Sequence, residues 1–207
     1  MKQSFMLLLW LTILSGLFSL TIFGQRATSF KFIDDEKKPD NSKLYITVNG
    51  EKRLISDNSS FAWLFNKGKE VAFITKGTGW DGQALWLSDV AKNQSRIIIS
   101  EYGLPISDVK EANLSNGKRA LLVELTADGD GGDGSLLFAV IDPQRGKVLF
   151  REYCKLTSIN GDFIKLSFYK EKYWLANQER RLKKKAKPFK IERLDLKKVL
   201  KNKVIVG

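Results

Sequence analysis

The chain has 207 residues with 35 Lys and Arg against 23 Asp and Glu, a formal net charge of +12, no histidine and one cysteine. The lack of histidine excludes Ser-His-Asp and Cys-His nucleophilic sites and histidine-based zinc or iron centres. The single cysteine, Cys154, excludes an intrachain disulfide and thiolate zinc sites. We expect a buried thiol and a monomeric protein.

Residues 1–24 have the composition of an export segment. Lys2 is followed by an uncharged run of 19 residues from Phe5 to Phe23, and Gly24 is a suitable cleavage point. The segment predicts either a cleaved signal peptide or an N-terminal membrane anchor, because the run is just long enough to span a bilayer. We therefore expect an exported protein, periplasmic or secreted, in which residues 25–207 form a single β-repeat domain.

After the export segment, short β-branched and aromatic runs alternate with Gly, Asn and Asp turns, a pattern that predicts an all-β fold. Residues 43–55, KLYITVNGEKRLI, predict a hairpin around Asn49-Gly50, a dipeptide that accepts the positive φ angles of a two-residue turn. Two later turns end in Gly-Lys before an apolar strand, at Gly68-Lys69 and Gly117-Lys118. LSFYKEKYWLA, residues 166–176, is interpreted as a third such turn that has lost its glycine.

Aspartates mark a repeat of about 50 residues. Asp89, Asp142 and Asp195 each follow an apolar run and precede a basic residue three positions later, and both intervals are 53 residues. A fixed period of this length with four strands per repeat is typical of β-propeller blades. We expect a small, four-bladed β-propeller, with an open β-sheet array or a sandwich as the alternative.

The predicted strands follow this register. The first repeat has three, SFKFI, KLYITV and KRLIS; the second has FAWLF, EVAFI, ALWLS and SRIII; the third has KEANL, RALLVEL, LLFAVI and KVLF. The fourth is expected to contain FIKLSF, KYWLA, FKIERL and KKVL, and the terminal KVIVG, residues 203–207, to complete the first repeat. The Gly-Lys turns followed by apolar strands, with Ser115 before the second, resemble the TolB-type β-propeller repeat over about 130 residues. The Pro-Asp step of that family's turn is absent, and the resemblance implies a propeller fold.

Long connections are expected after the second strand of each full repeat, and in the first repeat at residues 34–42. Residues 126–135, TADGDGGDGS, contain Asp128, Asp130 and Asp133. Three carboxylates this close could hold calcium through oxygen ligands, although the spacing departs from an EF-hand loop. The alternatives are a ligand-binding loop and a solvated turn, so the expected cofactor is none or calcium. In the connection at residues 75–83, Trp80 beside Asp81 is a candidate carbohydrate-binding pair.

The connection at residues 177–188 is strongly basic, and residues 180–190 hold seven positive charges and no acid. The candidate ligand-binding residues here are Arg180, Arg181, Lys183, Lys184, Lys185 and Lys187. We expect attraction to an anionic surface, namely lipid headgroups, an acidic glycan or an envelope polymer, or to another envelope protein. Nucleic acid is not expected, because no aromatic pattern interleaves these lysines. The alternatives are a solvated hairpin tip and pairing of this basic connection with the acidic connection at residues 126–135.

Two functional classes fit these features. The first is an exported, non-catalytic binding or scaffold module of the cell envelope or extracellular space, which uses one face of long loops. The second is a carboxylate-dependent carbohydrate-active enzyme, which needs two acids flanking one bond at roughly 5–10 Å. Asp81 with one of the three aspartates above could form that pair only if the two connections converge. We favour the module.

Overall fold

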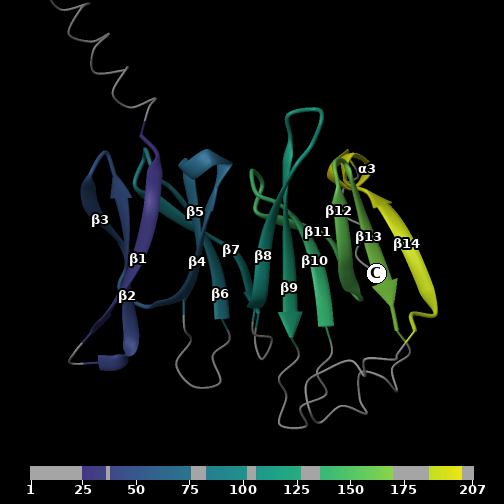
Figure 1. Ribbon diagram of the computed structural model, residues 1–207, viewed down its shortest axis with the longest axis horizontal. Coiled ribbons are helices and arrows are strands. Elements are labelled where there is room, and N and C mark those ends of the chain that lie inside the picture. Colours follow the sequence, from purple (N-terminus) through teal and green to yellow (C-terminus); the bar gives the residue numbers. More distant parts are fainter. Residues whose placement is uncertain are drawn as a thin grey trace, which may run out of the picture. The chain divides into compact units, whose positions relative to one another are not determined.

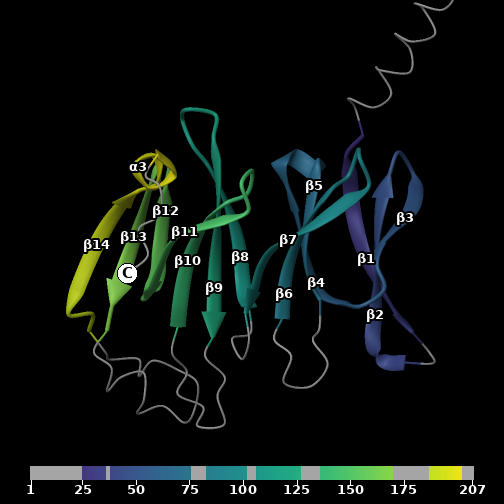
Figure 2. The ribbon, with the colours of Figure 1, turned by 180° about the vertical axis from the view of Figure 1, so that it is seen from behind.

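The computed structural model describes residues 25–35, 38–75, 83–101, 106–126, 136–169 and 187–201. Within them the chain forms four antiparallel sheets of three or four strands, and within each sheet the strands neighbour one another in chain order (Figures 1 and 2). The all-β prediction is confirmed. Within these residues no helix is long and apolar enough to cross a membrane. The expected export segment lies outside them.

The first three sheets match the predicted repeats. The first sheet contains β1 (Ala27–Asp35), β2 (Lys38–Val48) and β3 (Glu51–Ser56). The second contains β4 (Ser59–Phe65), the 3₁₀ turn η1 (Asn66–Gly68), β5 (Glu70–Thr75), β6 (Gln83–Asp89) and β7 (Gln94–Glu101). The third contains β8 (Ile106–Asn113), β9 (Arg119–Thr126), β10 (Leu136–Asp142) and β11 (Lys147–Tyr153).

The fourth repeat differs from the prediction. Its sheet contains β12 (Lys155–Asn160), β13 (Phe163–Phe168) and β14 (Lys190–Asp195), and it is followed by helix α3 (Leu196–Lys201). FIKLSF is therefore the second strand of its sheet rather than the first. The turn between β12 and β13 contains Gly161, where φ is +56°, and it is the counterpart of the two Gly-Lys turns. The interpretation of residues 166–176 as the third turn of that series is therefore wrong.

KKVL, predicted as the last strand of the fourth repeat, lies within helix α3. Leu196, Val199 and Leu200 are all buried, and their i, i+3, i+4 spacing places them on one face of a helix. Asp195 caps the first turn through its side chain. A four-residue run is too short to show its period, which explains the error. KYWLA and KVIVG lie outside the described residues.

The described chain divides into two compact units. The first consists of Met1–Ala72 with Ser88–Ser95, and the second of Phe73–Leu87 with Arg96–Gly207, so the boundary passes through the second sheet. In the first compact unit the predicted Asn49-Gly50 turn joins β2 to β3, with φ of +52° and +85°. Leu44, Ile46 and Val48 alternate along β2 and are buried, the period-2 pattern of a strand with one core face.

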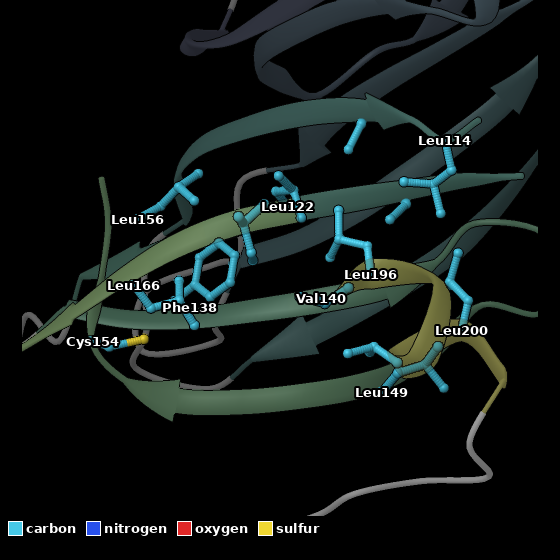
Figure 3. Close-up of a cluster of buried hydrophobic side chains, with 14 residues drawn as sticks. Leu114, Leu122, Phe138, Val140, Leu149, Cys154, Leu156, Leu166, Leu196 and Leu200 are labelled. Atoms are coloured by element: carbon cyan, nitrogen blue, oxygen red, sulfur yellow. The ribbon is translucent and has the colours of Figure 1, made fainter. Parts of the chain in front are cut away.

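The second compact unit has a core shared by the third and fourth sheets and α3 (Figure 3). Phe138 and Val140 of β10, Leu166 of β13 and Leu196 of α3 are all fully buried within it. Truncating such a side chain to alanine typically destabilises a protein by about 2–5 kcal/mol. This core fixes the fourth sheet against the third, and it leaves the opposite face of the fourth sheet outside the core.

The three repeat aspartates occupy equivalent positions, as predicted: each ends the third strand of its sheet. In each case the carboxylate oxygen Oδ1 accepts the backbone N–H groups two and three residues later. The distances are 3.0 and 3.0 Å at Asp89, 2.9 and 3.2 Å at Asp142, and 2.9 and 3.4 Å at Asp195. The carboxylate thus satisfies backbone donors that turn geometry leaves unpaired.

Candidate functional site

Most residues predicted to bind a ligand lie outside the described part of the chain. These are Trp80, Asp81, Asp128, Asp130, Asp133, Arg180, Arg181, Lys183, Lys184 and Lys185. Lys187 is described and is exposed. Within the described ranges no cluster of three or more Cys, Asp or Glu side chains could hold a metal ion. The calcium site and the Trp80-Asp81 pair therefore stay predictions.

The basic segment connects two neighbouring strands of one sheet. β13 ends at Phe168 and β14 begins at Lys190, and these two residues are register partners. The backbone N–H of Phe189 donates to the carbonyl oxygen of Phe168 at 2.9 Å. The same relation holds in the third sheet, where Thr126 pairs with Leu136. The two long connections predicted for the third and fourth sheets therefore each begin and end at a pair of neighbouring strand ends.

Lys190 is held at the start of β14. Its Nζ lies 5.0 Å from the centre of the Phe168 ring and 2.6 Å from the Oε1 atom of Glu192. The cation–π contact and the ion pair fix this lysine on the core-side face of the sheet, because its partner Phe168 packs against the core. The ion pair also engages Glu192, the acid of β14 that lies closer to Lys190 along the strand.

The opposite face of the fourth sheet, which we call the outer face, is defined by strand register. One cross-strand row contains Asn160, Phe163 and Asp195, and the next contains Ser158, Lys165 and Arg193. Adjacent core-side residues such as Ile164 and Leu166 are buried, so alternation along β13 places Phe163 and Lys165 on the outer face. Ile191 of β14 lies beyond this row and is 53% exposed.

A pocket of about 320 Å³ lies on the outer face. Its lining residues come from all three strands: Ser158, Asn160, Phe163, Ile164, Lys165, Ile191, Glu192 and Arg193. The Arg193 guanidinium carbon lies 3.8 Å from the centre of the Phe163 ring, a stacked cation–π arrangement. The pocket therefore combines hydroxyl and amide groups with two cationic side chains and an apolar wall.

The pocket is lined by two cations, Lys165 and Arg193, and by one acid, Glu192. No carboxylate among the described residues forms an ion pair with Lys165 or Arg193. Glu192 lines the pocket, but its carboxylate is paired with Lys190. Asp195, in the neighbouring row, caps α3. Lys165 and Arg193 are therefore not engaged by a described carboxylate and can contact an anion.

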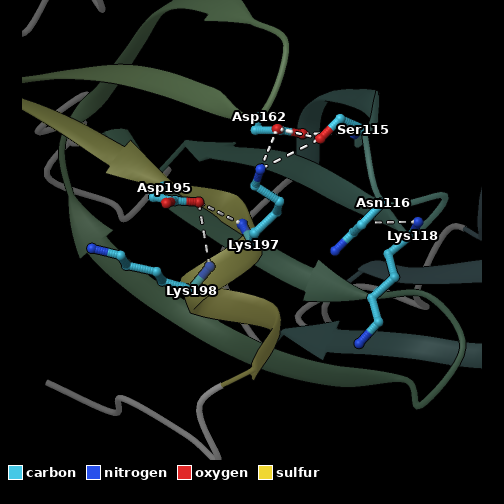
Figure 4. A network of polar contacts seen from close by, with 7 residues as sticks. All are labelled: Ser115, Asn116, Lys118, Asp162, Asp195, Lys197 and Lys198. Atoms are coloured by element: carbon cyan, nitrogen blue, oxygen red, sulfur yellow. Dashed lines mark hydrogen bonds and ion pairs between the residues drawn. The ribbon is translucent and has the colours of Figure 1, made fainter.

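A second polar cluster joins the third sheet, the fourth sheet and α3 (Figure 4). Asp162 accepts the backbone N–H of Ser115 at 2.7 Å and its hydroxyl at 2.6 Å. Lys197 Nζ lies 2.7 Å from the Asp162 carboxylate and 3.4 Å from the Ser115 hydroxyl oxygen. The hydrogen bonds from Lys197 and then from Ser115 lower the pKa of Asp162 from 3.8 to about 2.

Ser115 and Lys197 are the residue types of a serine–lysine catalytic pair, but the pKa of this lysine is not that of a general base. The hydrogen bond to Asp162 raises the pKa of Lys197 above 10.5, so the amine stays protonated and cannot act as a general base at neutral pH. Asp162, with its pKa near 2, is a poor proton acceptor. This cluster is a structural clamp that holds the turn between β12 and β13 against the turn between β8 and β9.

Cys154 is buried at 1% exposure within the core, as predicted. Burial raises the pKa of its thiol from 9.0 to about 12. At neutral pH the thiolate, which is the reactive form, is essentially absent.

Sequence reasoning did not identify the outer-face residues or the clamp. The alternation in FIKLSF and KIERLD was visible, and it indicates that Lys165 and Arg193 each face away from a core. The sequence did not show the register between β13 and β14, which places these two residues opposite each other although a long connection separates the strands. Asp162 and Ser115 are brought together from separate sheets, which no local pattern indicates.

No protein-family model matches the chain, and no curated protein matches it. Among solved structures, it is similar to the β-propeller domain of the trilobed protease from Pyrococcus furiosus, with a TM-score of 0.50 and 17% identity over 67% of this chain and 43% of that chain. It is also similar to TolB from Acinetobacter baumannii, with a TM-score of 0.47 and 15% identity over 79% and 38% of the two chains. The chain therefore spans less than half the length of these structures. At this identity the similarity shows the fold alone: the protein is all-β, and its antiparallel sheets match those of β-propeller domains.

Proposed function

We propose that the protein is an exported, non-catalytic binding module that recognises an anionic partner through the basic side of its fourth sheet. The partner is an anionic surface of the cell envelope or extracellular space, such as an acidic glycan, an envelope polymer or lipid headgroups. Export rests on the composition of residues 1–24. Our interpretation of the Gly-Lys turns as TolB-type repeats is supported by their places, between β4 and β5 and between β8 and β9.

The observation that carries the proposal is the concentration of positive charge in the connection between two strands of the fourth sheet. Residues 180–190 contain seven cations and no acid. Their two flanks are paired at Phe168 and Lys190, so the cationic segment is anchored to a hairpin stem rather than to a free chain end. The outer face of the same sheet adds Lys165 and Arg193. Clustered cations attract anionic surfaces at long range.

The enzyme alternative has less support. It requires Asp81 to converge with an aspartate of residues 126–135, and no observation on the described residues favours that convergence. The nearest arrangement to a catalytic pair in the described chain is Ser115 with Lys197, where the lysine is held protonated. A binding role needs only the charge and the rigid scaffold that long connections usually decorate.

The test is to change Lys183, Lys184, Lys185 and Lys187 to Gln and to measure retention on an acidic polysaccharide column. A matched control changes four exposed lysines elsewhere, Lys31, Lys52, Lys118 and Lys147, to Gln, and therefore has the same net charge. Each cation near an anionic surface contributes about 1 kcal/mol, so two engaged lysines predict a loss of about thirtyfold in affinity. The control variant should be retained nearly as well as wild type. Equal loss in both variants would show that only net charge matters.

A further inference from the structure

We propose that the outer-face pocket is a binding site for one sugar-sized unit bearing an oxyanion, with Arg193 and Lys165 contacting the anionic group. This inference deepens the proposed function, on which it rests, because it names the chemistry of a single unit of the anionic partner. It is carried by the described residues of β12, β13 and β14 alone and uses no residue of the basic connection. The pocket can therefore be tested separately from that connection.

Two like charges lie directly opposite each other on the outer face. Lys165 of β13 and Arg193 of β14 are register partners, and Ser158 of β12 continues the row on the other side of Lys165. Like charges directly opposite each other on one face of a sheet are destabilising. The outer-face acid Asp195 lies in the neighbouring row and forms no ion pair with either cation, so it offsets that repulsion only in part. An oxyanion placed between the two cations offsets it.

The orientation of the Arg193 side chain is restricted by its contact with Phe163. Its guanidinium stacks 3.8 Å from the centre of the Phe163 ring, which restricts the rotation of a side chain that is otherwise flexible. Stacking occupies a face of the planar group and leaves its N–H donors at the edge, where they can bind a carboxylate or phosphate with two parallel hydrogen bonds. A cation that is already ordered loses less conformational entropy when a ligand binds.

The other residues that line the pocket offer both polar and apolar contacts. Ser158 contributes a hydroxyl group and Asn160 an amide, which can donate to and accept from sugar hydroxyls. Ile191 supplies an apolar wall. The volume of about 320 Å³ lies at the lower end of the range for small-molecule sites, about 300–1,000 Å³. This combination suits a hydroxylated anion better than a fatty acid or a metal ion.

The test is a titration of the full-length protein, followed by NMR, with glucuronate, glucose 6-phosphate, glucose 6-sulfate and neutral glucose. We expect saturable shifts of Lys165 and Arg193 signals with at least one anionic sugar and none with glucose. The three anionic arms distinguish carboxylate, phosphate and sulfate as the source of the oxyanion. Equal binding of glucose, or no binding of any anionic sugar, would overturn the proposal.

Variants locate the site. Arg193→Gln should weaken binding at least tenfold, and Lys165→Gln should weaken it by a smaller factor. Lys147→Gln removes one exposed charge from β11 and should bind as wild type does. Arg193→Lys keeps the charge but loses the planar fork, so intermediate affinity is expected. Unchanged affinity in both Arg193→Gln and Lys165→Gln would place the anion elsewhere and refute the assignment.

The two experiments can show separately whether the pocket assignment is wrong and whether the proposed function is wrong. The quadruple Gln variant of the basic connection should still bind the anionic sugar, because all pocket residues remain. If that variant loses polysaccharide retention while the sugar titration is silent in wild type, the pocket assignment is wrong and the connection is the binding element. If retention is unaffected in the quadruple variant but Arg193→Gln abolishes sugar binding, the pocket assignment holds and the role of the connection is refuted.

Discussion

Asp195 Oδ1 accepts the backbone N–H of Lys197 at 2.9 Å. The same relation, two residues along the chain, recurs at Asp89 and at Asp142, with distances of 3.0 and 2.9 Å. The element after the aspartate differs among the sheets: a turn and a further strand in the second and third, and helix α3 in the fourth. The aspartate therefore specifies how the third strand ends, and the residues after it decide which element comes next.

Changing each of these aspartates to Ala should lower the free energy of unfolding by about 0.5–2 kcal/mol, the usual effect of losing a side-chain cap. Asp142 is only 8% exposed, so Asp142→Ala should lie at the upper end of that range. Asp142→Asn, which keeps an oxygen acceptor, should lose less than half as much. Urea unfolding of the variants gives the comparison. An effect at one aspartate and none at the other two would contradict their equivalence.

Gly68 and Gly117 form a matched pair with similar backbone angles, φ of +80° and +76°. A Cβ at Gly117 meets no atom within 4 Å, whereas a Cβ at Gly68 collides with the carbonyl oxygen of Ala27. Gly117→Ala should thus destabilise by about 1 kcal/mol, from the left-handed backbone alone. Gly68→Ala should add about 1–3 kcal/mol of overpacking. Equal unfolding midpoints in urea for the two variants would mean that the Ala27 contact is not maintained in solution.

How far the sequence predicts this fold depends on whether the signal is local. The Asn49-Gly50 hairpin and the two Gly-Lys turns are local signals and were confirmed; the equivalence of the three aspartates was predicted from their regular interval of 53 residues and was also confirmed. The strand β12 was missed because the turn at Gly161 is followed by Asp162 rather than lysine. Helix α3 was missed because KKVL is compatible with either a helix or a strand until its burial is known.

The candidate site was less predictable, since it depends on contacts between distant segments. Lys165 and Arg193 are register partners across the connection between β13 and β14, and register across so long a connection is not encoded by a turn type. The charge of residues 180–190 was evident from composition. That composition indicated which sheet to examine, but not the pocket on its outer face.

The Asp162 clamp should make part of the stability pH-dependent. A carboxyl whose pKa falls from 3.8 to about 2 on folding stabilises the native state above its unfolded pKa, and this contribution is lost as pH falls from about 4 to 2. Urea midpoints of wild type and Asp162→Asn should therefore differ by a constant amount from pH 5 to 7 and converge towards pH 2. In a Ser115→Ala background, the difference in urea midpoint caused by the Asp162→Asn change should be smaller from pH 5 to 7, because one hydrogen bond to the carboxylate is lost. A gap independent of pH would show that the clamp does not shift this pKa.

Cys154 should resist thiol reagents in the native protein. Burial in the core and a pKa raised to about 12 leave neither access nor thiolate at pH 8. A chromogenic disulfide reagent should react within minutes in concentrated urea and only at the rate of unfolding in buffer. Rapid native labelling would mean that β11 and β12 open locally around this position.

The most direct test measures the affinity of the protein for anionic and neutral surfaces as salt is raised. Vesicles with and without anionic lipid, and an acidic polysaccharide beside a neutral one, supply the surfaces. Because the screening length falls from about 10 Å at 0.1 M salt to about 3 Å at 1 M, wild-type binding to the anionic surfaces should be strong at low salt and nearly absent at high salt. The Lys183, Lys184, Lys185 and Lys187 to Gln variant should show weak binding throughout. Binding that is equal on neutral and anionic surfaces, or unchanged in that variant, would contradict an anionic partner recognised through the fourth sheet.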